Sequence, residues 1–204
     1  MLATLKAGRN EITVPQLSSL DFEKGGQLYV EYTGASDAEH WGVRVSGATA
    51  VPALDLYQVA DPAERLARTT AYLEKLEAHV GGNASVHYAY DEKNCIANAT
   101  DIMLDQMMCS VPAQQILADA GGGSTEARAE RLLASFDAMD QMMELFYQHK
   151  GLTNSFEKNT PAAVVKANSL PSQHLNIRYA RMFAGAFMYA AGNHIGIEWG
   201  SVPG

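Results

Sequence analysis

Two aspartates and six histidines are the side chains whose types and spacing could do chemistry in this 204-residue sequence. Asp101 and Asp105 stand four residues apart in a segment with helical spacing, which would place both carboxylates on one helical face. Such a pair could bind a metal ion or exchange protons with a substrate, although like charges at this spacing repel mildly. Alternatively, Asp101 compensates the helix dipole and Asp105 is solvated or hydrogen-bonded. We favour the second interpretation.

The histidines form no zinc motif of the zincin type. That motif, His-Glu-x-x-His, places two imidazoles on one helical face with a general base between them. None of the six histidines is followed by another histidine four residues later. The six are His40, His79, His87, His149, His174 and His194. His194 and Glu198 have this spacing but lie in a segment typical of a strand, where it only places them on one face. We therefore expect them to line a cleft and not to bind a metal together.

Other catalytic motifs are also absent from the sequence. The run 122–126 lacks the last glycine of a Gly-x-Ser-x-Gly elbow, and the dipeptide Gly-Lys of a phosphate-binding loop does not occur. Cys95 and Cys109 fit no zinc or redox spacing. We therefore predict no catalytic residue and no metal ligand in this chain.

The charge of the chain excludes several classes of partner. The formal net charge is −8 and no Lys/Arg-rich run occurs, so nucleic-acid and membrane-surface binding are disfavoured. The longest apolar run, 182–192, is far shorter than the roughly 20 residues of a membrane-spanning helix. The N-terminus has no pattern typical of a signal peptide.

Residues 1–55 are β-rich in their pattern. Apolar and polar residues alternate in 11–14, 28–32 and 41–45, between glycines, prolines and serines. Three short strands cannot close a barrel, so we expect them to form part of an antiparallel sheet. The segment that follows is typical of a helix start, with Asp61 as N-cap and Pro62 at the first helical position. We expect this helix to end at Gly81–Gly82.

Residues 56–204 are predicted to be mainly helical, so the predicted fold class is α+β. Expected helices cover 96–108, 112–120, 124–150 and 171–191, with a loop over 151–170 and a strand around Ile195 and Ile197. The longest helix has an apolar stripe formed by Leu132, Phe136, Met139, Met143 and Phe146. Cys95 and Cys109 flank the helix 96–108, which would hold them too far apart for a disulfide, so we expect buried thiols.

Ordered blocks of the sequence resemble the enhancin-like, mucin-targeting zinc metallopeptidases of peptidase family M60, which are of the gluzincin type. The blocks span nearly the whole chain, and their order is the stronger argument. They are residues 7–10, 25–30, 91–108, 146–151, 172–188 and 192–199.

The resemblance implies a zinc-dependent endopeptidase that acts on mucins or other glycoproteins and is exported from the cell. Its His-Glu-x-x-His helix, which supplies zinc ligands and general base, is absent from these residues and would follow Gly204. The chain alone is then expected to be inactive and to bind no zinc. Residues 1–55 would be a β-rich N-terminal part, and 56–204 the upstream part of the catalytic domain. Asn193, His194 and Glu198 would line the substrate cleft, on a strand before the zinc helix.

Two alternatives stay open. The chain could be a non-catalytic module that binds carbohydrate or glycoprotein, because its β-rich start and its scattered aromatic residues suit sugar stacking. These aromatics are Tyr88, Tyr90, Tyr147, Tyr179, Tyr189 and Trp199. It could also be an unrelated hydrolase that uses Asp101 and Asp105. In each case an incomplete sheet would expose an edge that favours association.

Overall fold

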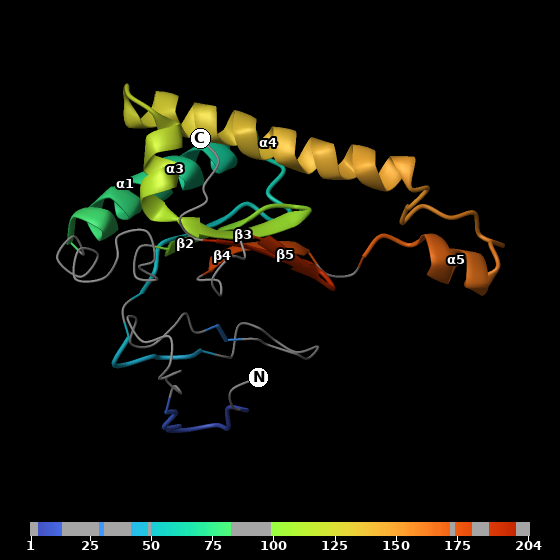
Figure 1. Cartoon of the computed structure of the whole chain (residues 1–204), viewed down its shortest axis with the longest axis horizontal. Helices are drawn as coiled ribbons and strands as arrows, with labels where there is room; N and C mark the ends of the chain where they lie inside the picture. The colour runs from blue at the N-terminus through green and yellow to red at the C-terminus, as the bar shows by residue number, and fades with distance from the viewer. Residues whose placement is uncertain are drawn as a thin grey trace.

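A six-stranded mixed sheet, covered on one face by helices, forms the centre of the computed structural model (Figure 1). The structure describes residues 4–13, 29–30, 42–48, 50–82, 99–171, 174–180 and 188–198. The strand order is β1-β2-β3-β4-β6-β5, with bounds Ala53–Asp55, Ala99–Met103, Met107–Pro112, Leu175–Ala180, His194–Glu198 and Met188–Ala191. β2 pairs antiparallel with β3, and β5 antiparallel with β6; the other neighbours are parallel.

The helices that cover the sheet begin where the sequence predicts. α1 spans Pro62–Gly82, and the Asp61 side chain caps it by accepting a hydrogen bond of 3.0 Å from the Ala63 amide. α3 spans Ala113–Ala120 directly after Pro112. α4 spans Thr125–His149, and Ser124 is its N-cap, with Oγ accepting from the Ala127 amide at 3.2 Å. The predicted helix starts are confirmed; Asp61 and Ser124 each accept from a backbone amide that a helix end leaves unpaired, whereas Pro112 makes no side-chain cap hydrogen bond.

The core lies between the sheet and the pair α1–α4. Leu73 and Leu76 of α1 are fully buried, as are Leu104 and Ile102 beside them in the sheet layer. On α4 the buried residues are Ala129, Leu132, Phe136, Met143 and Tyr147. The predicted stripe is thus largely confirmed, but Phe146 is 52% exposed and its neighbour Tyr147 is buried in its place.

The segment 99–112 is a β-hairpin, so the predicted helix over 96–108 is wrong for the residues that the structure describes. Ile102 pairs with Cys109, and their side chains share the face that packs against the helices. Cys109 is a buried free thiol, with its pKa raised to about 11 by burial and by the charge of Asp140. Because residues 99–112 form a hairpin, a helix between Cys95 and Cys109 is not the reason that the Cys109 thiol is free. Cys95 lies outside the described residues.

The predicted helix from Pro171 to Ala191 is also wrong for the residues that the structure describes. β4 and β5 occupy 175–180 and 188–191, and residues 172–173 and 181–187 lie outside the description. β4 is an interior strand between β3 and β6, so its neighbours in space are distant in sequence. Such pairing overrides local helix propensity. The predicted strand around Ile195 and Ile197 is confirmed as β6.

The structure changes two further predictions, the loop at 151–170 and the strands in residues 1–55. The predicted loop 151–170 contains α5, which spans Ala162–Asn168 after Pro161. Of the three strands expected in residues 1–55, the described parts 11–13, 29–30 and 42–45 lie in no strand. β1, at the end of this region, joins the sheet beside β2. The α+β fold class is confirmed, with a mixed sheet rather than a purely antiparallel one.

Candidate functional site

The segment 188–198 forms one edge of the sheet. β5 is the edge strand, and all four of its residues are exposed. Tyr189 pairs with Gly196 of β6, and its ring lies across that glycine, so that a Cβ at position 196 would collide with it. The ring also contacts His194 edge to face, with 5.4 Å between ring centroids. The sheet edge therefore presents an aromatic strip over a glycine.

The three residues expected in the cleft lie on or beside β6 but do not converge. His194 begins this strand and Glu198 ends it, and the description of Glu198 is limited to its backbone. A strand rises about 3.3 Å per residue, so their Cα atoms are about 13 Å apart. Asn193 lies in the turn before β6. Its side-chain amide donates to the backbone carbonyl of His174 at 3.4 Å, and its backbone carbonyl accepts from the backbone amide of Asn176 at 2.8 Å. Asn193 thus fastens the turn to the start of β4.

The aspartate pair does not form a joint site. Asp101 lies in β2 and accepts hydrogen bonds from Ser110 and from the Tyr29 hydroxyl. Asp105 lies in the turn between β2 and β3, where its Oδ1 accepts from the Gln58 amide at 2.7 Å. The two carboxylates have separate donors on separate elements, so the geometry supports neither a shared metal nor a proton relay between them.

A hollow of about 350 Å³ lies around the Asp105 turn, and no pattern in the sequence predicts it. Residues from four separate segments line it: Tyr57, Gln58, Asp105, Gln106, Tyr147, Asn154, Leu170, Pro171 and His174. Sequence patterns single out only three of them: Asp105 as part of an aspartate pair, Tyr147 as one of the scattered aromatics and His174 as one of the histidines. No local signal marks the others, because the turn, the loops and the end of α4 meet only in the folded chain.

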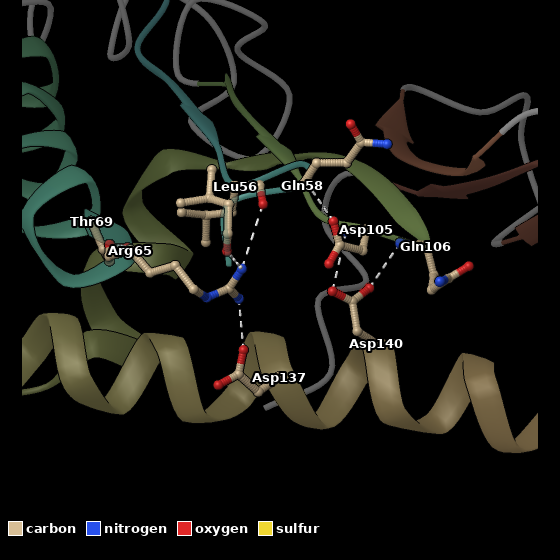
Figure 2. A network of polar contacts seen from close by, with 9 residues as sticks. Leu56, Gln58, Arg65, Thr69, Asp105, Gln106, Asp137 and Asp140 are labelled. Carbon is tan, nitrogen blue, oxygen red and sulfur yellow. Dashed lines mark hydrogen bonds and ion pairs between the residues drawn. The ribbon is translucent and has the colours of Figure 1, made fainter. Parts of the chain in front are cut away.

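The turn between β2 and β3 is fastened to α4 through Asp140 (Figure 2). The Asp140 carboxylate accepts from the amides of Gln106 at 2.9 Å and Asp105 at 3.2 Å. Burial raises the pKa of Asp140; the two amide hydrogen bonds oppose this shift, and the nearby charge of Asp105 adds to it. A group with a raised folded pKa binds its proton more tightly in the folded state.

The stability of the protein should therefore respond to pH through Asp140. As pH rises from about 3.8 through the raised pKa, the free energy of unfolding should lose the contribution of this proton. Asp140→Asn should show a flatter decline over that window, measured by urea unfolding at a series of pH values. Asp119→Asn, an exposed carboxylate on α3, is the control and should keep the wild-type slope. An unchanged slope in Asp140→Asn would contradict the assignment.

The described residues do not fit a zinc ion. Among them, no group of three or more His, Cys, Asp or Glu side chains is placed to hold a metal. His194 and Glu198 are too far apart to share one, as the strand geometry above requires. Within the same residues, no helix is both long enough and apolar enough to cross a bilayer.

Comparison with known proteins identifies the fold. No protein-family model matches the chain, and no curated protein sequence is similar to it. Among solved structures, it is similar to the M60 catalytic domain of ZmpC from Clostridium perfringens in complex with the sialyl T antigen. The identity is 18% and the TM-score 0.50, over 77% of this chain and 25% of that one. The ZmpB metallopeptidase of the same organism is 19% identical, with a TM-score of 0.49 over 77% and 25%.

The chain spans about a quarter of the length of these structures. The similarity to the ZmpC domain shows that the described sheet and helices have the fold of part of an M60 catalytic domain. The resemblance of the sequence blocks to this class of metallopeptidase is thereby confirmed at the level of fold.

Proposed function

We propose that this chain forms the upstream part of the catalytic domain of a zinc-dependent endopeptidase of the M60 type. The zinc ligands and the general base would come from a His-Glu-x-x-His helix that these 204 residues do not contain. The observation that carries the proposal is the similarity of the sheet and its helices to the ZmpC domain, at a TM-score of 0.50. The substrates would be mucins or other glycoproteins, and the site of action outside the cell.

The exposed edge strand supports a role in holding substrate. β5 has β6 on one side and no described strand on the other. Such an edge can pair with an extended peptide through main-chain hydrogen bonds. Tyr189 and His194 would flank the bound peptide, with Asn193 holding the turn at one end of this sheet edge and Glu198 at the far end of β6. The same open edge could also pair with another chain.

A cleavage assay tests the peptidase proposal. The product of the complete coding frame should cut a mucin-type glycoprotein, and a chelator should abolish cleavage until zinc is restored. The 204-residue chain alone should neither cut this substrate nor retain stoichiometric zinc after washing with chelator. The proposal fails if the coding frame continues for about a hundred residues without a His-Glu-x-x-His motif. Zinc-dependent cleavage by the short chain would equally contradict it.

The alternative function is a non-catalytic module that binds carbohydrate or glycoprotein on the same scaffold. The aromatic strip of Tyr189 and His194 over Gly196 is the observation at the sheet edge that suits it. Retention of mucin by the complete gene product, without any cleavage in the presence of zinc, would favour this alternative over a peptidase.

A further inference from the structure

The hollow at the Asp105 turn has one wall that is held rigidly in a strained conformation. Gln58 has a φ of 56°, the only positive φ of a non-glycine residue in the part of the chain that the structure describes. A side chain in this left-handed region crowds the backbone, so the conformation is unfavourable unless its surroundings hold it. The Asp105 carboxylate holds the Gln58 amide in place, and the Leu56 amide is bonded to the Met103 carbonyl at 2.9 Å. Strain that several neighbours maintain is typical of a functional site.

Arg65 of α1 also holds the loop that carries Gln58, through hydrogen bonds to its backbone carbonyls (Figure 2). Its guanidinium donates to the carbonyls of Leu56 at 3.4 Å and Val59 at 3.3 Å, and forms an ion pair of 2.6 Å with Asp137 of α4. The loop is therefore tied to α1, to α4 and to the β2–β3 turn at once. A wall built in this way is ordered before any ligand binds, which lowers the entropy cost of binding.

Several polar groups at the hollow are free to bind a ligand. Asp105 uses Oδ1 for the Gln58 amide, but Oδ2 has no partner among the described residues. The side-chain amides of Gln106 and Asn154 likewise have no hydrogen-bond partner within the described part of the chain. A carboxylate oxygen accepts hydrogen bonds from hydroxyl groups, and a side-chain amide both donates and accepts them. Together they match a ligand with several hydroxyl groups.

Aromatic and apolar surfaces complete the hollow. Tyr57 is 45% exposed and is fixed edge to face against His174, with 4.9 Å between ring centroids. Leu170 and Pro171 add apolar surface to the lining. A sugar ring has an apolar face of C–H groups and an edge of hydroxyls, which suits a tyrosine face beside amides and a carboxylate. The volume of about 350 Å³ lies at the small end of the usual range for ligand sites, about 300–1,000 Å³.

The charges at the hollow disfavour anionic ligands, and its lining does not suit a divalent metal. Asp105 and the adjacent Asp140 make this region negative, and the guanidinium of Arg65 is already bound by Asp137 and two carbonyls. An anionic ligand would meet uncompensated carboxylate charge. A divalent metal would lack ligands, because no group of three suitable side chains exists among the described residues. A neutral ligand with hydroxyl groups avoids both problems.

We propose that this hollow is a binding site for a neutral sugar residue, with Tyr57 as its stacking surface and Asp105, Gln106 and Asn154 as its hydrogen-bonding groups. The site is separate from the sheet edge at β5, although the Asn193–His174 hydrogen bond links the two. The inference does not depend on peptidase activity. It would give a protein that acts on glycoproteins a second contact with its substrate.

Titration with free sugars tests this proposal. The whole chain would be titrated with galactose, N-acetylgalactosamine and N-acetylneuraminic acid, followed by ligand-observed NMR. We expect saturable binding of at least one neutral sugar and weaker binding of the anionic one. Asp105→Asn keeps an oxygen for the Gln58 amide but removes the charged acceptor, and should weaken neutral-sugar binding about tenfold. Tyr57→Ala should weaken it about five- to tenfold through lost stacking.

Matched variants keep the test interpretable. Asp119→Asn replaces a carboxylate on α3 that accepts one side-chain hydrogen bond and lies outside the hollow. Phe146→Ala removes an exposed aromatic ring that does not line the hollow. Both should bind like the wild type. Gln58→Gly relieves the positive φ, so it should stay folded while losing one wall of the site. The proposal is overturned if no neutral sugar binds saturably, or if Asp105→Asn and Tyr57→Ala both bind like their controls. Loss of peptidase activity in the complete gene product would leave these titrations unchanged.

Discussion

Leu132→Ala is expected to lower the free energy of unfolding by about 2–5 kcal/mol. Leu132 is 3% exposed on the face of α4 that packs against α1 and α3, in the same buried cluster as Phe136. Removing its side chain deletes apolar contacts and leaves a cavity that close-packed neighbours cannot fully collapse into. Urea unfolding followed by circular dichroism measures the effect as a shift of the midpoint at constant slope.

Leu145→Ala is the matched control, because the same substitution is made on the same helix. Leu145 is 64% exposed, so the expected change is within about 0.5 kcal/mol. The contrast tests which face of α4 is buried when the chain folds. Equal losses in the two variants would mean that α4 does not pack against α1 and α3 in the described orientation.

Arg65→Ala is expected to destabilise the fold by about 2–3 kcal/mol. The Arg65 side chain is 14% exposed and connects the Leu56–Val59 loop to α4 through Asp137. Its removal leaves two carbonyls and a half-exposed carboxylate without their charged donor. Because the loop carries Tyr57 and Gln58, neutral-sugar binding should fall together with the free energy of unfolding.

Arg68→Ala separates this effect from the loss of a surface charge. Arg68 lies one turn further along α1 and is 44% exposed; it pairs with Glu64 four residues earlier and donates to the Asp55 carbonyl at 3.0 Å, but it does not reach α4. Exposed pairs of this kind contribute well under 1 kcal/mol. Arg65→Lys keeps the charge but not the planar fork, so its loss should fall between the wild type and Arg65→Ala. If Arg65→Ala and Arg68→Ala are equally mild, the bridge between loop and α4 contributes little.

The helices that cover the sheet could be predicted from local chemistry. Asp61 followed by Pro62, and Ser124 before Thr125, satisfy unpaired amides at the first turn of a helix, and this requirement does not depend on the rest of the chain. The four- and three-residue spacing of Leu132, Phe136, Met139 and Met143 predicted the buried face of α4 for a similar reason. Phe146 keeps that spacing but is exposed, because Tyr147, four residues after Met143, takes the buried position at the end of the helix.

The strands β2, β3 and β4 could not be predicted in the same way. Their residues have helix-compatible compositions, and Met103, Met107 and Cys109 fit a helix as well as a strand. The decision comes from partners distant in sequence, since Ser110 pairs with Arg178 and Tyr179 with Ile197. Strand pairing and packing against α1 and α4 outweigh a local preference of less than about 1 kcal/mol per residue.

Local patterns in the chain were enough to predict the helix caps, most of the buried stripe of α4 and a strand around Ile195 and Ile197. They also show that these residues contain no His-Glu-x-x-His motif. The tertiary structure alone decided the mixed sheet, the separation of Asp101 from Asp105, and the hollow that Tyr57, Gln58 and Asp105 share. The difference lies in how far apart along the chain the interacting groups are. Caps and helical stripes are satisfied by atoms within a few residues, whereas sheets and hollows are built from contacts that local patterns do not encode.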